Sequence, residues 1–182
     1  MTSSSAGIVF GLTGAALLTV GTLAYQAFAT APAKLAGTQA SAASSAPKAP
    51  RDKRHPKALP GRSGHGERVV YSLDDDRIWL VAPGDRVTRT FTVTPSSVDP
   101  EPGTYGVTSR SNRATGSDGT AIEHVVRFTS VEGVTIGFSA AVDGSSPTHD
   151  PAVKTGGIRE SRPDGDALWE FATIGAKVVV IR

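Results

Sequence analysis

The C-terminal stretch, residues 150–182, constrains the fold of this chain more than any other part. Its closing run, Val178–Ile181, is apolar on both faces, which is typical of a strand buried in the middle of a sheet. Ahead of this run, Pro163 suits the first turn of a helix and Gly175 suits its exit. We therefore predict one short helix over residues 163–172, followed by a central strand.

From Arg68 onward the sequence has the pattern of short strands separated by turn residues. Apolar and β-branched residues alternate with polar ones, and Gly, Pro and Asp bound the runs. The polar segment Ser111–Thr120 is predicted to be a loop. The expected fold class is mainly β, with strands at Val69–Tyr71, Arg77–Val81, Val87–Thr94, Thr104–Val107, His124–Phe128 and Val134–Phe138.

The run Lys154–Arg159 is similar to a known signature. Its sequence, Lys-Thr-Gly-Gly-Ile-Arg, resembles the Ser-His-Gly-Cys-Val-Arg run of the L,D-transpeptidases (YkuD-type), which cross-link peptidoglycan through that cysteine. In this comparison Lys154 stands for the serine, Thr155 for the histidine and Gly157 for the cysteine. The other three positions match.

Earlier positions extend the resemblance. The run Pro102–Tyr105 is similar to the start of a strand in that family, and Trp169 also matches. A family strand ending in Gly-Phe delivers a histidine into the cleft, but here Ser139 follows Gly137-Phe138. The resemblance implies mixed β-sheets with one short C-terminal helix over residues 68–182.

The catalytic groups of the family are missing from this chain. It contains no cysteine, so it has no thiolate nucleophile, thiolate metal ligand or disulfide. Ser139, Thr155 and Gly157 are therefore interpreted as vestigial active-site positions, and no catalytic residue is assigned. No cofactor is expected, and no metal site either, because the histidines lack the HxH or HxxxH spacing of metal ligands.

A remodelled active site is the alternative interpretation. Ser139 and Thr155 carry hydroxyl groups, His149 could act as a base, and Asp143 or Asp150 could orient it. Loops rich in Ser, Thr, Asp and His are nevertheless common in proteins without such chemistry.

Gly156, Gly157 and Arg159 are the ligand-binding candidates. The glycines permit a close backbone with positive φ, whose N–H groups could face an anion. Arg159 could add a fork of donors for a carboxylate. In the opposing interpretation, the glycines only form a tight turn and Arg159 is held by Glu160 or Asp164.

Residues 1–31 are predicted to be a transmembrane anchor or a signal peptide. The run Ala6–Ala31 carries no charge and is long enough to span a bilayer. Ala27-Phe28-Ala29 fits the small-x-small pattern of a cleavage site that would release the chain from Thr30 onward. No Lys or Arg precedes the run, so the positive-inside rule taken literally places the following segment in the cytoplasm. The family resemblance implies the outside, and we expect an extracytoplasmic domain.

Residues 32–67 are predicted to be a disordered linker, because they are rich in Ala, Ser, Pro and Lys and poor in large apolar residues. Residues 1–67 carry seven Lys/Arg and two acidic residues, whereas residues 68–182 carry twelve and fifteen. The positive charge thus belongs to the linker, and no nucleic-acid partner is expected for the domain.

These observations favour a membrane-tethered pseudoenzyme outside the cytoplasm, which is secreted if the chain is cleaved after Ala29. Its expected partner is the peptidoglycan stem peptide or a cell-wall protein. Two alternatives remain open: an active peptidoglycan transferase or hydrolase with the Ser/Thr-His site, and a structural envelope protein that has lost ligand binding.

Overall fold

The structure, a computed structural model, describes residues 54–145 and 153–182. By their contacts the residues form two units, 1–46 and 47–182, and every described residue belongs to the second. The predicted anchor and most of the predicted linker lie outside the described residues. Within the described part, no helix is both long enough and apolar enough to cross a membrane.

The first sheet has five strands in the order β3-β2-β1-β9-β4. β9 lies inside this sheet, parallel to β1 on one side and antiparallel to β4 on the other. This confirms the central position predicted for the C-terminal run. A 3-10 turn, η1 (Pro83–Asp85), joins two of the strands, whose bounds are β1 (Arg68–Ser72), β2 (Arg77–Ala82), β3 (Arg86–Thr92), β4 (Gly103–Gly106) and β9 (Lys177–Ile181).

The second sheet has four strands in the order β5-β6-β7-β8. They are β5 (Ser109–Thr115), β6 (Ala121–Val131), β7 (Val134–Ala141) and β8 (Gly157–Glu160). β7 and β8 are parallel, and their register sets Gly137 opposite Gly157 and Ser139 opposite Arg159. The two pieces of the family-like signature therefore meet on neighbouring strands.

The prediction of a polar loop over Ser111–Thr120 is mostly wrong. Residues 109–115 form the edge strand β5, and the chain turns only at residues 116–120. An edge strand with little burial carries polar residues at successive positions. The hydrophobic alternation that marks a half-buried strand is therefore absent from β5.

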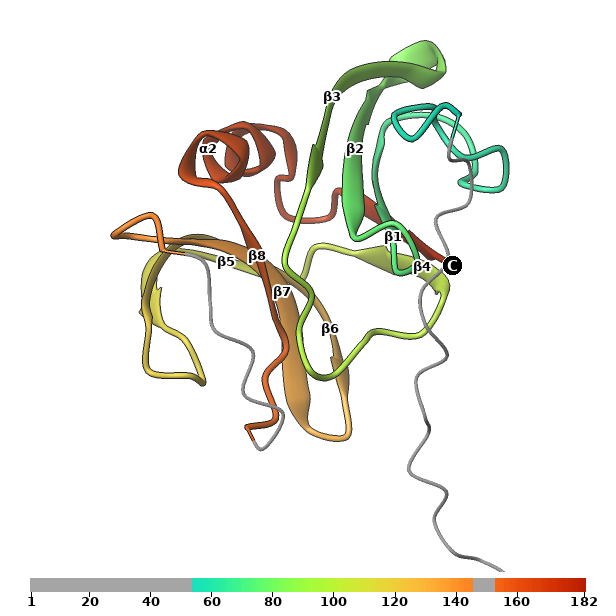
Figure 1. Ribbon diagram of the computed structural model, residues 1–182. Helices are drawn as coiled ribbons and strands as arrows, with labels where there is room; N and C mark the ends of the chain where they lie inside the picture. The colour runs from blue at the N-terminus through green and yellow to red at the C-terminus, as the bar shows by residue number, and fades with distance from the viewer. Residues whose placement is uncertain (1–53, 146–152) are drawn as a thin grey trace, which may run out of the picture. The chain divides into compact units, whose positions relative to one another are not determined.

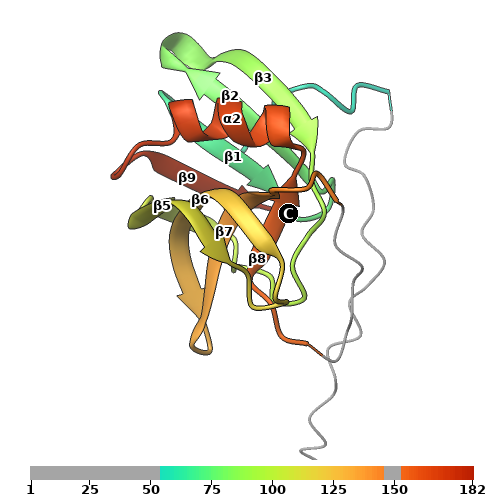
Figure 2. The same cartoon turned by 90° about the vertical axis from the view of Figure 1, so that its left-hand side faces the viewer.

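The single helix of the described residues, α2 (Arg162–Phe171), agrees closely with the prediction. It packs on β6 and β7, and Leu168 on its inner side is fully buried. Figures 1 and 2 show α2 lying beside the hairpin of β2 and β3. Its Trp169 ring stacks with His124, and the Arg110 guanidinium lies 3.6 Å from the ring centre.

The main hydrophobic core lies between the two sheets and under α2. A smaller cluster occupies the opposite face of the first sheet, where Val70, Trp79, Val81 and Val179 are buried and Leu59 packs against them. The indole N–H of Trp79 donates to the Lys57 carbonyl oxygen at 2.9 Å.

The second part of the predicted linker, residues 54–67, is thus part of the fold. Arg68 is 1% exposed and donates to the Ser63 carbonyl at 2.7 Å and to the Asp85 carboxylate at 2.6 Å. The folded part therefore begins before residue 68, because this segment covers an apolar sheet face.

Candidate functional site

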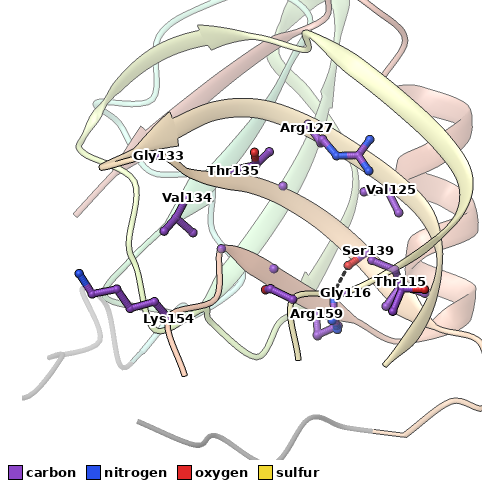
Figure 3. A pocket seen from close by; sticks show the side chains of 15 residues that line it. Thr115, Gly116, Val125, Arg127, Gly133, Val134, Thr135, Ser139, Lys154 and Arg159 are labelled. Carbon is purple, nitrogen blue, oxygen red and sulfur yellow. Dashed lines mark hydrogen bonds between the residues drawn. The ribbon is translucent and has the colours of Figure 1, made fainter. Parts of the chain in front are cut away.

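A cleft of about 380 Å³ lies over the second sheet. Alternation along β7 sets two sides: Ile136 and Phe138 point into the core, while Thr135, Gly137 and Ser139 line the cleft. Figure 3 shows Arg127 on one side of the cleft, Ser139, Gly116 and Arg159 on the other side, and Lys154 at the far end. Its full lining is Thr115, Gly116, Ser117, Ile122, Val125, Arg127, Gly133, Val134, Thr135, Gly137, Ser139, Lys154, Gly156, Gly157 and Arg159.

Four sequence-predicted positions line this cleft: Ser139, Gly156, Gly157 and Arg159. Thr155, the fifth, does not. Its backbone N–H donates to Ser97 Oγ at 2.8 Å, and its carbonyl oxygen accepts the Val98 N–H at 3.1 Å. The position aligned with the family's histidine is therefore attached to the segment around Ser97.

The expected positive φ at Gly156 and Gly157 is wrong, because neither glycine has one. The requirement for glycine at these positions is steric instead. A Cβ on Gly156 would overlap the Thr135 carbonyl oxygen and lie 2.8 Å from Ile136 Cδ1. A Cβ on Gly157 would lie 2.7 Å from Nη1 of Arg159.

Arg159 is buried beneath the cleft surface, with only 6% of its side chain exposed. Its Nη1 donates to Ser139 Oγ, and its Nη2 donates to the two Asp118 carboxylate oxygens at 3.0 and 3.2 Å. Its backbone pairs with Thr94 in both directions. Arg159 is therefore held by an acid, as one interpretation expected, but the acid is neither Glu160 nor Asp164.

The two acids named for that role have other surroundings. The Asp164 carboxylate accepts hydrogen bonds from Nε and Nη2 of Arg89, at 2.9 and 2.7 Å. Glu160 is buried beside Gly165, and neither of its carboxyl oxygens has a hydrogen-bond partner among the described residues. Burial and the nearby Asp164 raise the pKa of Glu160 well above its usual value, although the Arg159 charge opposes the shift.

Asp118 is the site residue that sequence reasoning missed. It lies in the turn between β5 and β6, and Thr120 N–H also donates to its carboxylate, at 3.1 Å. Partial burial acts to raise the pKa of Asp118, but the Thr120 hydrogen bonds and the charge and hydrogen bonds of Arg159 outweigh it and lower the pKa. The pair Asp118-Gly119, with Gly119 at φ +79°, is a hairpin-turn signal that could have located this turn.

The cleft lacks a nucleophile–base pair among the described residues. Its lining contains neither histidine nor cysteine, and Ser139 Oγ is bonded to a guanidinium that cannot accept a proton. His149 and Asp150 lie outside the described residues, and Asp143 accepts the Ser145 N–H at 2.9 Å. No cluster of potential metal ligands occurs in the described part of the chain.

Two further cations line the cleft. Lys154 is exposed and lies 3.4 Å from the exposed Glu132 carboxylate. Arg127 is half-buried and donates from Nη1 to Ser111 Oγ at 2.9 Å. With Arg159 neutralised by Asp118 and Lys154 close to Glu132, the cleft can attract an anion through Arg127.

No protein-family model matches this sequence, and no curated protein matches it. Solved structures do match. An L,D-transpeptidase (Yku) from Stackebrandtia nassauensis has a TM-score of 0.56 and 15% identity, covering 70% of this chain and 62% of that one. An L,D-transpeptidase from Xylanimonas cellulosilytica has a TM-score of 0.52 and 16% identity, covering 69% and 65%.

A third match is a fused Zn-dependent amidase/peptidase/peptidoglycan-binding domain-containing protein from Clostridium acetobutylicum, with a TM-score of 0.51 and 12% identity. It covers 63% of this chain and 51% of that one. The chain thus spans less than two thirds of the length of each of these three structures, and identities this low show the fold alone. The protein has a mainly β fold of two mixed sheets with one short C-terminal helix, similar to L,D-transpeptidase (YkuD) catalytic domains, in a chain without cysteine.

Proposed function

We propose that this protein is a non-catalytic L,D-transpeptidase-like module that binds peptidoglycan stem peptides outside the cytoplasm. One observation carries the proposal: the guanidinium of Arg159 occupies the space that a side chain at position 157 would need. A site whose nucleophile position contains a buried, neutralised cation is not arranged for acyl transfer, which needs a nucleophile and a base in contact.

The protein has a cleft although the catalytic cysteine of the family is absent, and this supports a binding role. Its floor is the pair of parallel strands β7 and β8, and Gly137 and Gly157 have no side chains that would fill it. The polar side chains of the lining carry either a hydroxyl group or a positive charge, and Ile122, Val125 and Val134 are its apolar members. Such a surface suits a peptide ligand that carries carboxylates.

The choice of peptidoglycan as the ligand follows from resemblance. Two of the matching solved structures are named as L,D-transpeptidases and a third is named for a peptidoglycan-binding domain. The proposed location depends on the uncharged run Ala6–Ala31, which would tether the module to the membrane, or release it after cleavage beyond Ala29. A reporter joined after Arg182 should then be active only as an extracytoplasmic reporter, whereas a cytoplasmic signal would contradict this topology.

The binding proposal is tested by sedimenting the purified protein with isolated peptidoglycan sacculi. We expect it to sediment with the sacculi and to be released by soluble muropeptides that carry a stem peptide. Soluble glycan strands without stem peptides are the matched competitor and should release none. Failure to sediment would reject the binding proposal.

The absence of catalysis is tested separately by intact-mass spectrometry after incubation with a carbapenem. We expect the mass of the protein to stay unchanged. A stable acyl adduct would reject the non-catalytic proposal and support a remodelled Ser/Thr site, which peptide mapping would then locate at Ser139 or Thr155.

A further inference from the structure

The cleft contains three cations, Arg159, Lys154 and Arg127, which differ in whether a carboxylate of the protein already pairs with them. The Arg159 guanidinium donates to Ser139 and to both oxygens of Asp118, and its side chain is 6% exposed. A ligand carboxylate could reach it only by displacing Asp118. Arg159 therefore forms a structural ion pair with Asp118, which holds the β5–β6 turn against β8.

Lys154 offers a charge but little geometry. Its side chain is 72% exposed, and its ammonium group lies 3.4 Å from Glu132. An exposed ammonium group on a flexible stem forms weak, poorly directed contacts. It can add to the local potential, but it does not define the place where a ligand binds.

Arg127 combines a free charge with a fixed position. Its Nη1 donates to Ser111 Oγ, and no carboxylate of the described residues forms an ion pair with it. Its side chain starts against Gly137 on the neighbouring strand, where a Cβ would lie 3.1 Å from Arg127 Cα and 3.3 Å from its Cγ. Gly137 thereby leaves room for the Arg127 stem on the cleft side of the sheet.

Figure 3 shows the Arg127 side chain across the cleft from Ser139 and Arg159, whereas Lys154 lies at the far end. Arg127 on β6 is opposite Gly137 on β7, which is opposite Gly157 on β8. A guanidinium presents a planar fork of N–H donors that matches the two oxygens of a carboxylate. One of its two Nη groups contacts Ser111, so other donors of the fork remain for a ligand.

We propose that Arg127 is the carboxylate receptor of this cleft, and that the ligand group it binds is the terminal carboxylate of a peptide. This inference deepens the proposed function, on which the choice of a stem peptide rests. It moves the anion-binding role from Arg159 on β8, where the signature resemblance would put it, to Arg127 on β6, across the cleft. Ser111 holds the guanidinium in place, and Lys154 adds only to the attraction at long range.

The test compares a free carboxylate with its amide. Calorimetry at low salt measures the binding of a disaccharide-tetrapeptide muropeptide in its free-acid form and in its C-terminal amide form. We expect the wild type to prefer the acid. Arg127→Gln should weaken acid binding by roughly 10- to 100-fold and remove the preference, because a charge-assisted hydrogen bond is lost.

Two variants serve as controls. Arg113→Gln removes the same charge from an exposed position on β5 outside the cleft lining, and it should bind like the wild type. Arg127→Lys keeps the charge without the fork and should recover only part of the affinity. Amide NMR spectra of each variant check that the fold is retained.

A second probe, N-acetyl-D-alanine, separates the inference from the proposed function. NMR titration should perturb the Arg127 Nε–H signal in the wild type. Binding of this small carboxylate without muropeptide binding would support Arg127 as a receptor and reject the stem-peptide ligand. Muropeptide binding of equal strength in wild type and Arg127→Gln would overturn the inference and leave the proposed function standing. Binding of neither probe would overturn both.

Discussion

The guanidinium of Arg159 lies beside the Cα of Gly157, two residues away on the same strand, so closely that a side chain at position 157 would require the guanidinium to move. A Cβ on Gly157 would approach Nη1 of Arg159 to 2.7 Å and its Cζ to 3.3 Å. On its other side, a Cβ on Gly116 would approach Nη2 to 2.6 Å. The guanidinium is therefore clamped between two glycines, with Ser139 and Asp118 as its polar partners.

This clamp predicts that Gly157→Ala destabilises the protein by about 1–3 kcal/mol, the usual cost of overpacking a well-filled site. The cost arises because Arg159 has to move away from Ser139 and Asp118. In a protein that already carries Arg159→Ala, the same Gly157→Ala change should cost little. Urea unfolding of both single variants and the double variant, combined as a double-mutant cycle, measures this coupling.

Gly156→Ala is the control for this cycle. Its Cβ would overlap the backbone carbonyl of Thr135 and approach Ile136 Cδ1, and no atom of Arg159 is among these contacts, so removing Arg159 should give no relief. A Gly157→Ala cost that persisted without Arg159 would contradict the clamp.

Asp118→Asn should destabilise the fold by about 1–3 kcal/mol, because it leaves the buried Arg159 guanidinium without its carboxylate. The pKa of Asp118 is lowered from its usual value of 3.8. Its stabilising effect is therefore complete above that value and is lost as the pH falls through the lower folded pKa.

The advantage of the wild type over Asp118→Asn should thus be constant near neutral pH and shrink below about pH 3.8. Thermal unfolding at a series of pH values measures it. Asp143→Asn, which removes an exposed carboxylate that accepts hydrogen bonds from Ser145 and from its own backbone, should leave stability at neutral pH nearly unchanged. Equal effects of the two substitutions would show that Asp118 does not stabilise Arg159.

Glu160→Gln is expected to stabilise the protein at neutral pH. The folded pKa of Glu160 is raised well above its usual 4.5, mainly by burial. The folded state keeps the proton that the unfolded state loses above pH 4.5. Stability is therefore highest below that pH and falls as the pH rises towards the folded pKa, with a slope of about 1.4 kcal/mol per pH unit.

Glutamine at this position does not titrate, so the variant should lose that slope. At pH 4 the variant should be no more stable than the wild type. Towards pH 7 its free energy of unfolding should exceed that of the wild type by a growing amount. A stability difference between the two proteins that did not change with pH would mean that Glu160 ionises in the folded state without cost.

The segment before β1 should be required for full stability. A chain that begins at Arg68 loses Leu59 from the outer cluster and the Lys57 carbonyl that accepts the Trp79 N–H. We expect its free energy of unfolding to be about 2–4 kcal/mol lower than that of a chain beginning at Arg54, because a packed apolar face is uncovered. Urea unfolding of the two chains measures this difference.

Arg68→Met tests the same segment within the full chain. It removes the bonds to Ser63, Gly66 and Asp85 and should speed proteolytic cleavage between residues 54 and 67. The exposed Arg62→Met is the matched control and should leave the cleavage rate unchanged. Equal rates in both variants would mean that Arg68 does not hold this segment.

The sequence by itself determined the fold class, the short C-terminal helix and the missing cysteine chemistry. Period-two alternation and turn residues report the local direction of side chains, so the strands β6 and β7 were predictable. A run that is apolar on both faces is typical of a buried strand, so β9 was predictable too. The absence of cysteine holds for any fold that the chain adopts. The resemblance of residues 154–159 to a signature indicated where the cleft would lie, and Ser139, Gly156, Gly157 and Arg159 do line it.

Only the tertiary structure decided what those residues contact. Asp118 is 41 positions away from Arg159 in the sequence, and no local pattern specifies which acid meets a buried guanidinium. Burial of an apolar sheet face, not the composition of residues 54–67, decides that this polar segment packs on the first sheet. Local periodicity is a property of neighbouring residues, whereas strand register and the burial of distant groups depend on how the whole chain packs.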